Sequence, residues 1–125
     1  IEALTMIDMI KKDILPAACS YMKDISKEAI NKKELCADIS CELEETLLKK
    51  LSSLSADLYN KMEQLSDMVE PEKEFDCIIE EAKFYRSVLS EQMESTRTIA
   101  DGIESLVGAK YWPYPTYGDL LFSVI

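Results

Sequence analysis

Apolar residues recur at intervals of three and four along the first quarter of the chain, which is the spacing of one face of an α-helix. The stripe consists of Leu4, Ile7, Ile10, Ile14, Ala18, Tyr21, Met22, Ile25, Ala29 and Ile30. Pro16 lies inside it, and a proline removes one backbone donor while its ring clashes with the preceding turn. The sequence therefore predicts a first helix over residues 3–33, kinked or broken near residues 13–15.

The second apolar stripe is the narrowest and predicts a helix over residues 41–69. Its members advance by alternating steps of three and four, as in a coiled coil. They are Leu47, Leu51, Leu54, Leu58, Met62, Leu65, Met68 and Val69. Such a helix is roughly 40 Å long. Pro71 forbids its continuation and is favourable in the first turn of a following helix.

A third stripe predicts a helix over residues 72–107. Its members are Phe75, Ile78, Ile79, Ala82, Tyr85, Leu89, Met93, Thr96, Ile99, Ala100, Ile103, Leu106 and Val107. Gly102 inside this helix costs about 1 kcal/mol relative to alanine, so local fraying or a close contact is expected there. Gly108 is predicted to end the helix in the left-handed conformation.

These helices predict an all-α fold, an antiparallel bundle of three long helices in a single domain, residues 1–125. The short link at residues 70–71 makes the second and third helices antiparallel neighbours. A longer connection joins the first helix to the second, and the first helix completes the bundle. No strand-like alternation competes with the helical spacing.

The last stretch, residues 109–125, differs from the helices. Its prolines fix their own φ and bias the preceding residues away from helix, while Thr116 and Asp119 form a Thr-x-x-Asp cap for a short helical turn. The predicted structural anchors are Trp112, Pro113, Pro115, Tyr117, Leu121 and Phe122. We expect an extended tail that ends in a short helical turn and lies as a strap over the bundle or a neighbouring domain. An aromatic ligand-binding box is the alternative.

Composition restricts the class of partner. The chain has 47% apolar and 30% charged residues, which is typical of neither a disordered nor a membrane protein. Its net charge of −10 argues against nucleic acid and anionic membrane as partners, since both require a basic face. The first residues lack the layout of a signal peptide. Because the chain begins with Ile1 rather than Met, we expect it to be a piece of a longer protein.

The cysteines indicate a reducing compartment. Cys19, Cys36, Cys41 and Cys77 form no Cys-x-x-Cys pair, and the closest spacing matches no standard zinc motif. We therefore expect reduced, structural thiols in a cytoplasmic protein. A metal or disulfide site at Cys36 and Cys41 is the alternative.

Residues suited to catalysis are scarce. The chain has no His, which removes Ser-His, Cys-His and histidine metal sites, and its 3 Gly form no phosphate loop. The adjacent glutamates at 44–45 and 80–81 diverge around a helix. Arg86 and Arg97 lie near one helix face, where salt bridges or interface contacts are favoured over an anion site. The sequence thus predicts no catalytic, cofactor-binding or metal-ligating residue.

Three segments together resemble the C-terminal end of type III glutamine synthetases: AKFYRSVL (82–89), ADGIESLV (100–107) and YWPYPTYGDLLF (111–122). ILPAACSYMKDI (14–25) is similar to a family helix that carries Ile-Leu-Pro-Ala followed by Tyr. The matching positions are Ala82, Lys83, Arg86, Arg97, Asp101, Glu104, Val107, Trp112, Pro113, Pro115, Tyr117, Leu121 and Phe122. The chain departs from the family at Gly102 and at Tyr114, where leucine is common. The middle helix matches only in being long and amphipathic.

The resemblance implies a non-catalytic C-terminal helical domain with a structural or assembly role. The whole enzyme of that family makes glutamine from glutamate and ammonia in nitrogen metabolism, using ATP and a divalent metal such as Mg²⁺. The implied partners are the upstream catalytic domain and the other subunits of a cytoplasmic dodecamer. Because the family's active site lies upstream, no catalytic residue is carried over to this chain.

Two other classes remain. One is a free-standing helical oligomerisation or adaptor module, which a start codon just before Ile1 would favour. The other is a small helical enzyme or cofactor binder, which a thermal shift with nucleotide or metal would favour. An open reading frame upstream that encodes a synthetase catalytic domain would distinguish both from the glutamine synthetase interpretation.

Overall fold

A computed structural model describes residues 2–69 and 78–115, and all regular secondary structure in these residues is helical. Its elements are α1 (Glu2–Met9), η1 (Ile10–Ile14), α2 (Leu15–Leu35), α3 (Glu42–Met68), α4 (Ile78–Lys83), η2 (Phe84–Leu89), α5 (Ser90–Leu106) and η3 (Ala109–Tyr111). η1 and η2 are π-helical, and η3 is a short 3₁₀-helix. The all-α prediction is confirmed for the described part of the chain.

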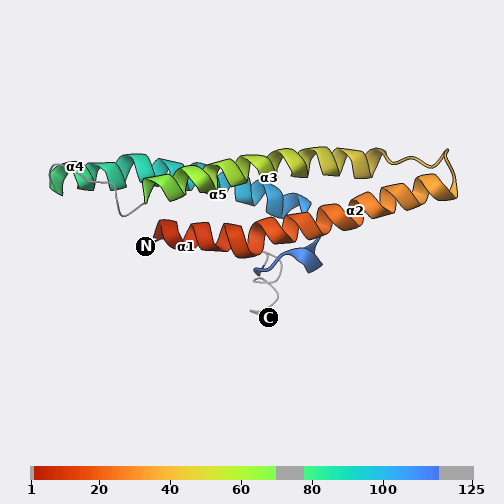
Figure 1. Ribbon diagram of the computed structural model, residues 1–125, viewed down its shortest axis with the longest axis horizontal. Helices are drawn as coiled ribbons and strands as arrows, with labels where there is room; N and C mark the ends of the chain where they lie inside the picture. Colours follow the sequence, from red (N-terminus) through yellow and green to blue (C-terminus); the bar gives the residue numbers. More distant parts are fainter. Residues whose placement is uncertain (1, 70–77, 116–125) are drawn as a thin grey trace, which may run out of the picture.

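The first helical stretch is irregular at Pro16, as predicted, but it is not broken. α1, η1 and α2 follow one another without a gap from Glu2 to Leu35, and the π-helical η1 lies just before Pro16. A π turn widens the helix at the point where the proline has no N–H to donate and its ring needs space. The helical path changes direction at this turn (Figure 1).

α3 is the central helix of the fold. It contacts α1, α2 and α5, and it runs antiparallel to α2 and to α5 (Figure 1). Leu51, Leu58 and Leu65, spaced by seven, are fully buried along it. Leu65 packs in a second cluster with Ala3 and Leu89. The main core joins Leu51 and Leu58 to buried side chains of the other helices, namely Ile10, Ile14, Ala18, Ile103 and Val107. The narrow stripe that predicted α3 is thus the centre of the core.

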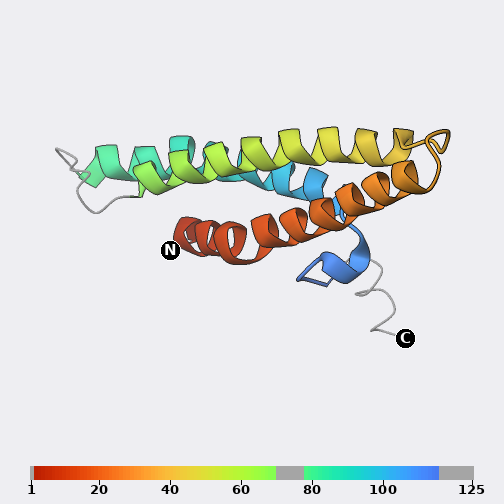
Figure 2. The same cartoon turned by 45° about the vertical axis from the view of Figure 1, so that its right-hand side comes forward.

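The α2–α3 hairpin projects beyond the end of α5. Figure 2 shows that the last turns of α2 and the first turns of α3 continue past the point where α5 ends. The connection over residues 36–41 closes this hairpin, and we call its exposed Ile30, Leu35 and Leu43 the hairpin tip. Only two helices therefore form this end of the described structure.

The third stretch is helical from Ile78 to Leu106, within the predicted 72–107, and residues 72–77 lie outside the described part. The π turn η2 was not predicted, because no proline or glycine marks it. The predicted left-handed cap at Gly108 is wrong. Gly108 has φ −57° and ψ 140°, and Val107 is already extended at φ −77° and ψ 135°. Val107 is buried in the main core, and the backbone is already extended at this residue.

Gly102 and Gly108 differ in the space that is available for an added methyl group. A Cβ at Gly102 would lie 3.6 Å from Leu54 Cδ1, an ordinary contact, whereas at Gly108 it would lie 3.2 Å from Tyr21 Cε1. We expect Gly102→Ala to raise the free energy of unfolding by about 1 kcal/mol, because alanine favours helix. Gly108→Ala should lower it, since the tyrosine ring must move. Urea unfolding of both variants tests this; stabilisation by both would contradict it.

Candidate functional site

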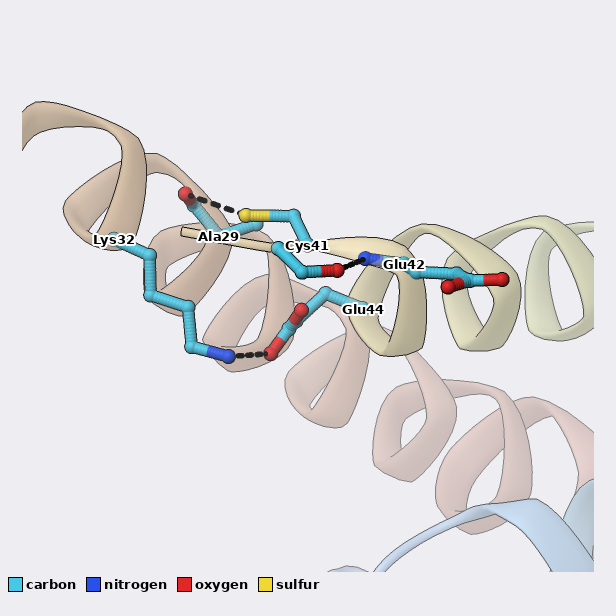
Figure 3. Close-up of polar contacts among 6 residues, drawn as sticks. Ala29, Lys32, Cys41, Glu42 and Glu44 are labelled. Carbon is cyan, nitrogen blue, oxygen red and sulfur yellow. Dashed lines mark hydrogen bonds and ion pairs between the residues drawn. The ribbon is translucent and has the colours of Figure 1, made fainter. Parts of the chain in front are cut away.

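A buried carboxylate lies where α2 and α3 meet. Glu44 is 1% exposed, and Lys32 Nζ on α2 donates a hydrogen bond to Glu44 Oε1 (Figure 3). This bond lowers the pKa of Glu44 and raises the pKa of Lys32. Glu44 Oε2 is buried too, and it has no hydrogen-bond partner in the described structure. The pair holds the two helices in one register, at the cost of one unsatisfied oxygen.

The sequence analysis named Glu44 only as one of two adjacent, diverging glutamates and did not predict its burial, although its position gives a signal. It lies seven residues before Leu51 and therefore continues the buried series of Leu51, Leu58 and Leu65. A charged residue in that register is either unfavourable or paired across the helix interface. The spacing therefore indicates burial, but only the structure identifies Lys32 as the partner.

Cys41 fixes the start of α3. It is 5% exposed, and its thiol donates a hydrogen bond of 3.4 Å to the carbonyl of Ala29 (Figure 3). Cys19, Cys36 and Cys41 are all free, so the alternative disulfide between Cys36 and Cys41 is not formed. Cys77 lies outside the described residues. No group of three potential ligands in the described part could hold a metal ion.

Two tyrosines attach the tail to the first helical stretch. Tyr111 donates a hydrogen bond to the Asp24 carboxylate, and Tyr114 donates one of 2.7 Å to Asp13 Oδ2. The hydrogen bond to Asp24 raises the pKa of Tyr111. Burial, followed by the bond to Asp13, raises the pKa of Tyr114 to about 12. The ring of Tyr111 also packs edge-on against Tyr21, with centroids 5.1 Å apart.

The structure places only part of the predicted tail anchor. Trp112 is half-buried against the main core, and its ring centroid lies 6.2 Å from that of Tyr114. Pro113 and Pro115 are exposed. Tyr117, Leu121 and Phe122, and the predicted helical turn that contains them, lie outside the described residues. The sequence analysis missed Tyr111 and Tyr114 as anchors. The sequence carries only a weak signal for these two hydrogen bonds. Their acceptors, Asp13 and Asp24, are eleven residues apart, which is three helical turns, and therefore lie on one face of the first helical stretch.

Arg97 makes a local contact, and the side chain of Arg86, its predicted neighbour on the helix face, lies outside the described part. The guanidinium of Arg97 is exposed and lies 3.9 Å from Glu94 of the same helix, so its contact is local rather than interhelical. Among the described residues, no helix is long and apolar enough to cross a membrane. The hydrogen bonds of the Lys32–Glu44 pair and of the tail tyrosines each join two segments of the described structure.

Comparison with known proteins identifies relatives of the chain. No family model and no solved structure matches it. It is 38% identical to a glutamine synthetase of Butyrivibrio fibrisolvens, over 99% of this chain and 18% of the relative. It is 26% identical to a type-3 glutamine synthetase of Dictyostelium discoideum, over 98% of this chain and 17% of the relative. The chain is therefore homologous to a segment of glutamine synthetases, the type 3 enzymes included, that makes up less than a fifth of their length.

Proposed function

We propose that the chain is the C-terminal helical domain of a type III glutamine synthetase, and that it serves structure and assembly rather than catalysis. The observation that carries the proposal is the match itself: nearly the whole chain aligns with less than a fifth of each relative. The remaining four-fifths leave room for an upstream catalytic domain. That domain would join ammonia to glutamate with ATP and Mg²⁺ in the cytoplasm.

The local chemistry favours a structural role. The buried Glu44 is bound to Lys32, and the tail tyrosines are bound to aspartates of the first helical stretch. Each of these groups joins two segments of the fold. A catalytic acid or base must instead reach a substrate from a cleft, within hydrogen-bond distance of the proton that it transfers.

An isolated chain is expected not to bind ATP, because the proposed function puts the nucleotide and the metal in the catalytic domain. Isothermal titration calorimetry with ATP and Mg²⁺ should give no saturable heat at micromolar concentrations. The matched control is the full-length enzyme under the same conditions, which should bind. Saturable binding by the isolated chain would contradict the proposal and would favour a small cofactor-binding protein.

The hairpin tip is the surface that we propose for assembly. Leu35 is 83% exposed, Leu43 is 68% and Ile30 is 58%, all at the end where only α2 and α3 are present. Single exposed apolar residues are common, but three on one projecting end favour contact with the catalytic domain or a neighbouring subunit. In the alternative function, a free-standing oligomerisation module, the hairpin tip would bind another copy of the chain, and there would be no catalytic domain.

Removing two leucines from the hairpin tip is expected to weaken assembly without unfolding the chain. In the full-length enzyme, Leu35→Ser with Leu43→Ser should shift the light-scattering mass toward smaller species. In the isolated chain, the same double variant should reduce self-association and leave the melting temperature nearly unchanged. Lys49→Ser with Lys50→Ser, which changes exposed charged residues of α3, is the matched control. An unchanged mass in both proteins would rule out the hairpin tip as the assembly surface.

A further inference from the structure

A groove runs along the bundle between α1 and α5. Both helices contact α3, and the groove, with a volume of about 560 Å³, opens between them. Its apolar lining includes Met6, Met9 and Ile10 from the first helical stretch and Met93 and Ala100 from α5. Met9 is 37% exposed, so this apolar surface is not covered by the described residues. Methionine side chains adapt readily to the shape of an apolar partner.

The chain itself leads into this groove. Trp112, Tyr114 and Pro115 form part of its wall, and the bond from Tyr114 to Asp13 fixes them at the Ile14 end. Pro115 is the last described residue of the tail. The ten residues that follow it in the sequence therefore start at the groove.

Those ten residues have the length and the apolar pattern to fill the groove. From Glu2 to Ile14 the helical wall is roughly 18 Å long, and ten residues span about 15 Å as a helix or up to about 35 Å when extended. Tyr117, Leu120, Leu121 and Val124 have the spacing of one helix face. These four side chains make that face apolar, while the residues between them are Gly118, Asp119, Phe122 and Ser123.

We propose that residues 116–125 bind in the groove between α1 and α5 of the same chain, with the face that contains Leu121 and Val124 toward the methionines. The occupant is this segment rather than a second copy, because Pro115 already lies in the wall and the connection costs little chain entropy. The proposal concerns only this chain's residues and is independent of the proposed function.

Trp112 provides the readout, because it is the only tryptophan and it lines the groove. Deletion of residues 116–125 should shift its fluorescence maximum to longer wavelength and increase binding of an apolar dye. A synthetic peptide of residues 116–125 should reverse both changes. Circular dichroism of the truncated chain checks that the helices remain.

Point variants test the groove without a truncation. Met9→Glu places a charge on the groove wall and should shift Trp112 emission to longer wavelength, as the deletion does. Leu4→Glu is the matched control: Leu4 is 58% exposed on the same helix but does not line the groove, and its emission should be unchanged. Leu120→Ser with Leu121→Ser should reproduce the shift, whereas Ser123→Ala should not.

Two results would overturn the proposal. If deletion of residues 116–125 and Met9→Glu both leave Trp112 emission and dye binding unchanged, the segment does not occupy the groove. If the emission of the full chain instead moves to longer wavelength on dilution, the occupant is a second copy. Emission that is independent of concentration, together with the peptide effect, supports the segment of the same chain.

Discussion

Leu58→Ala is expected to lower the free energy of unfolding by about 2–5 kcal/mol, the usual range for removing a buried leucine side chain. Leu58 is fully buried at the middle of α3, in one cluster with Ile14 and Ile103. Three helical stretches meet in this cluster, so the neighbours cannot all move in to fill the cavity. Urea unfolding followed by circular dichroism measures the loss, with the m-value as a check on two-state behaviour.

Leu43→Ala is the matched control, since it removes the same atoms from the same helix. Leu43 is 68% exposed, so its free energy of unfolding should change by at most about 0.5 kcal/mol. In the longer protein of the proposed function, the two substitutions should have the opposite order of effect on assembly, because Leu43 belongs to the hairpin tip and Leu58 does not. Equal losses of stability in the two isolated variants would contradict the burial of Leu58 in the core.

The periodicity of the sequence predicted the helices well, because helix formation and one-sided burial leave a local pattern. The second stripe gave residues 41–69, and α3 spans Glu42–Met68. Pro16 gave the site of the irregularity, since a proline has the same steric effect in any helix. These features depend on residues within one or two turns of each other.

Features that depend on partners from elsewhere in the chain could not be predicted. Gly108 carried the signal of a left-handed cap, yet the backbone is extended from Val107, which packs in a core built from distant helices. The π turn η2 has no local marker. In the sequence Glu44 resembles a solvent-exposed charge, because its partner Lys32 lies on another helix, α2. The tail anchors Tyr111 and Tyr114 require the same long-range information.

Deleting residues 111–125 is expected to lower the free energy of unfolding by about 2–3 kcal/mol and the thermal midpoint by about 10 °C. Trp112 and Tyr114 are half-buried against the main core, and a large apolar side chain contributes about 1.5–3 kcal/mol when fully buried. The bond from Tyr111 to Asp24 adds to this loss. Deleting residues 116–125 alone keeps Tyr111, Trp112 and Tyr114 and should lower the thermal midpoint less. Differential scanning calorimetry distinguishes the two truncations.

Alkaline pH should also weaken the attachment of the tail to the bundle, because Tyr114 loses its proton there. Its pKa is raised from 10.0 to about 12, so it stays protonated in the folded chain at a pH where the unfolded chain has lost the proton. The contribution of protonated Tyr114 to the free energy of unfolding is therefore complete below pH 10.0 and is lost as the pH rises to about 12. The ionised phenol would then face the carboxylates of Asp13 and Asp8. Tyr114→Phe cannot ionise, so its midpoint should fall less between these pH values, although it lacks the bond to Asp13. An equal fall in both proteins would show that Tyr114 does not hold the tail.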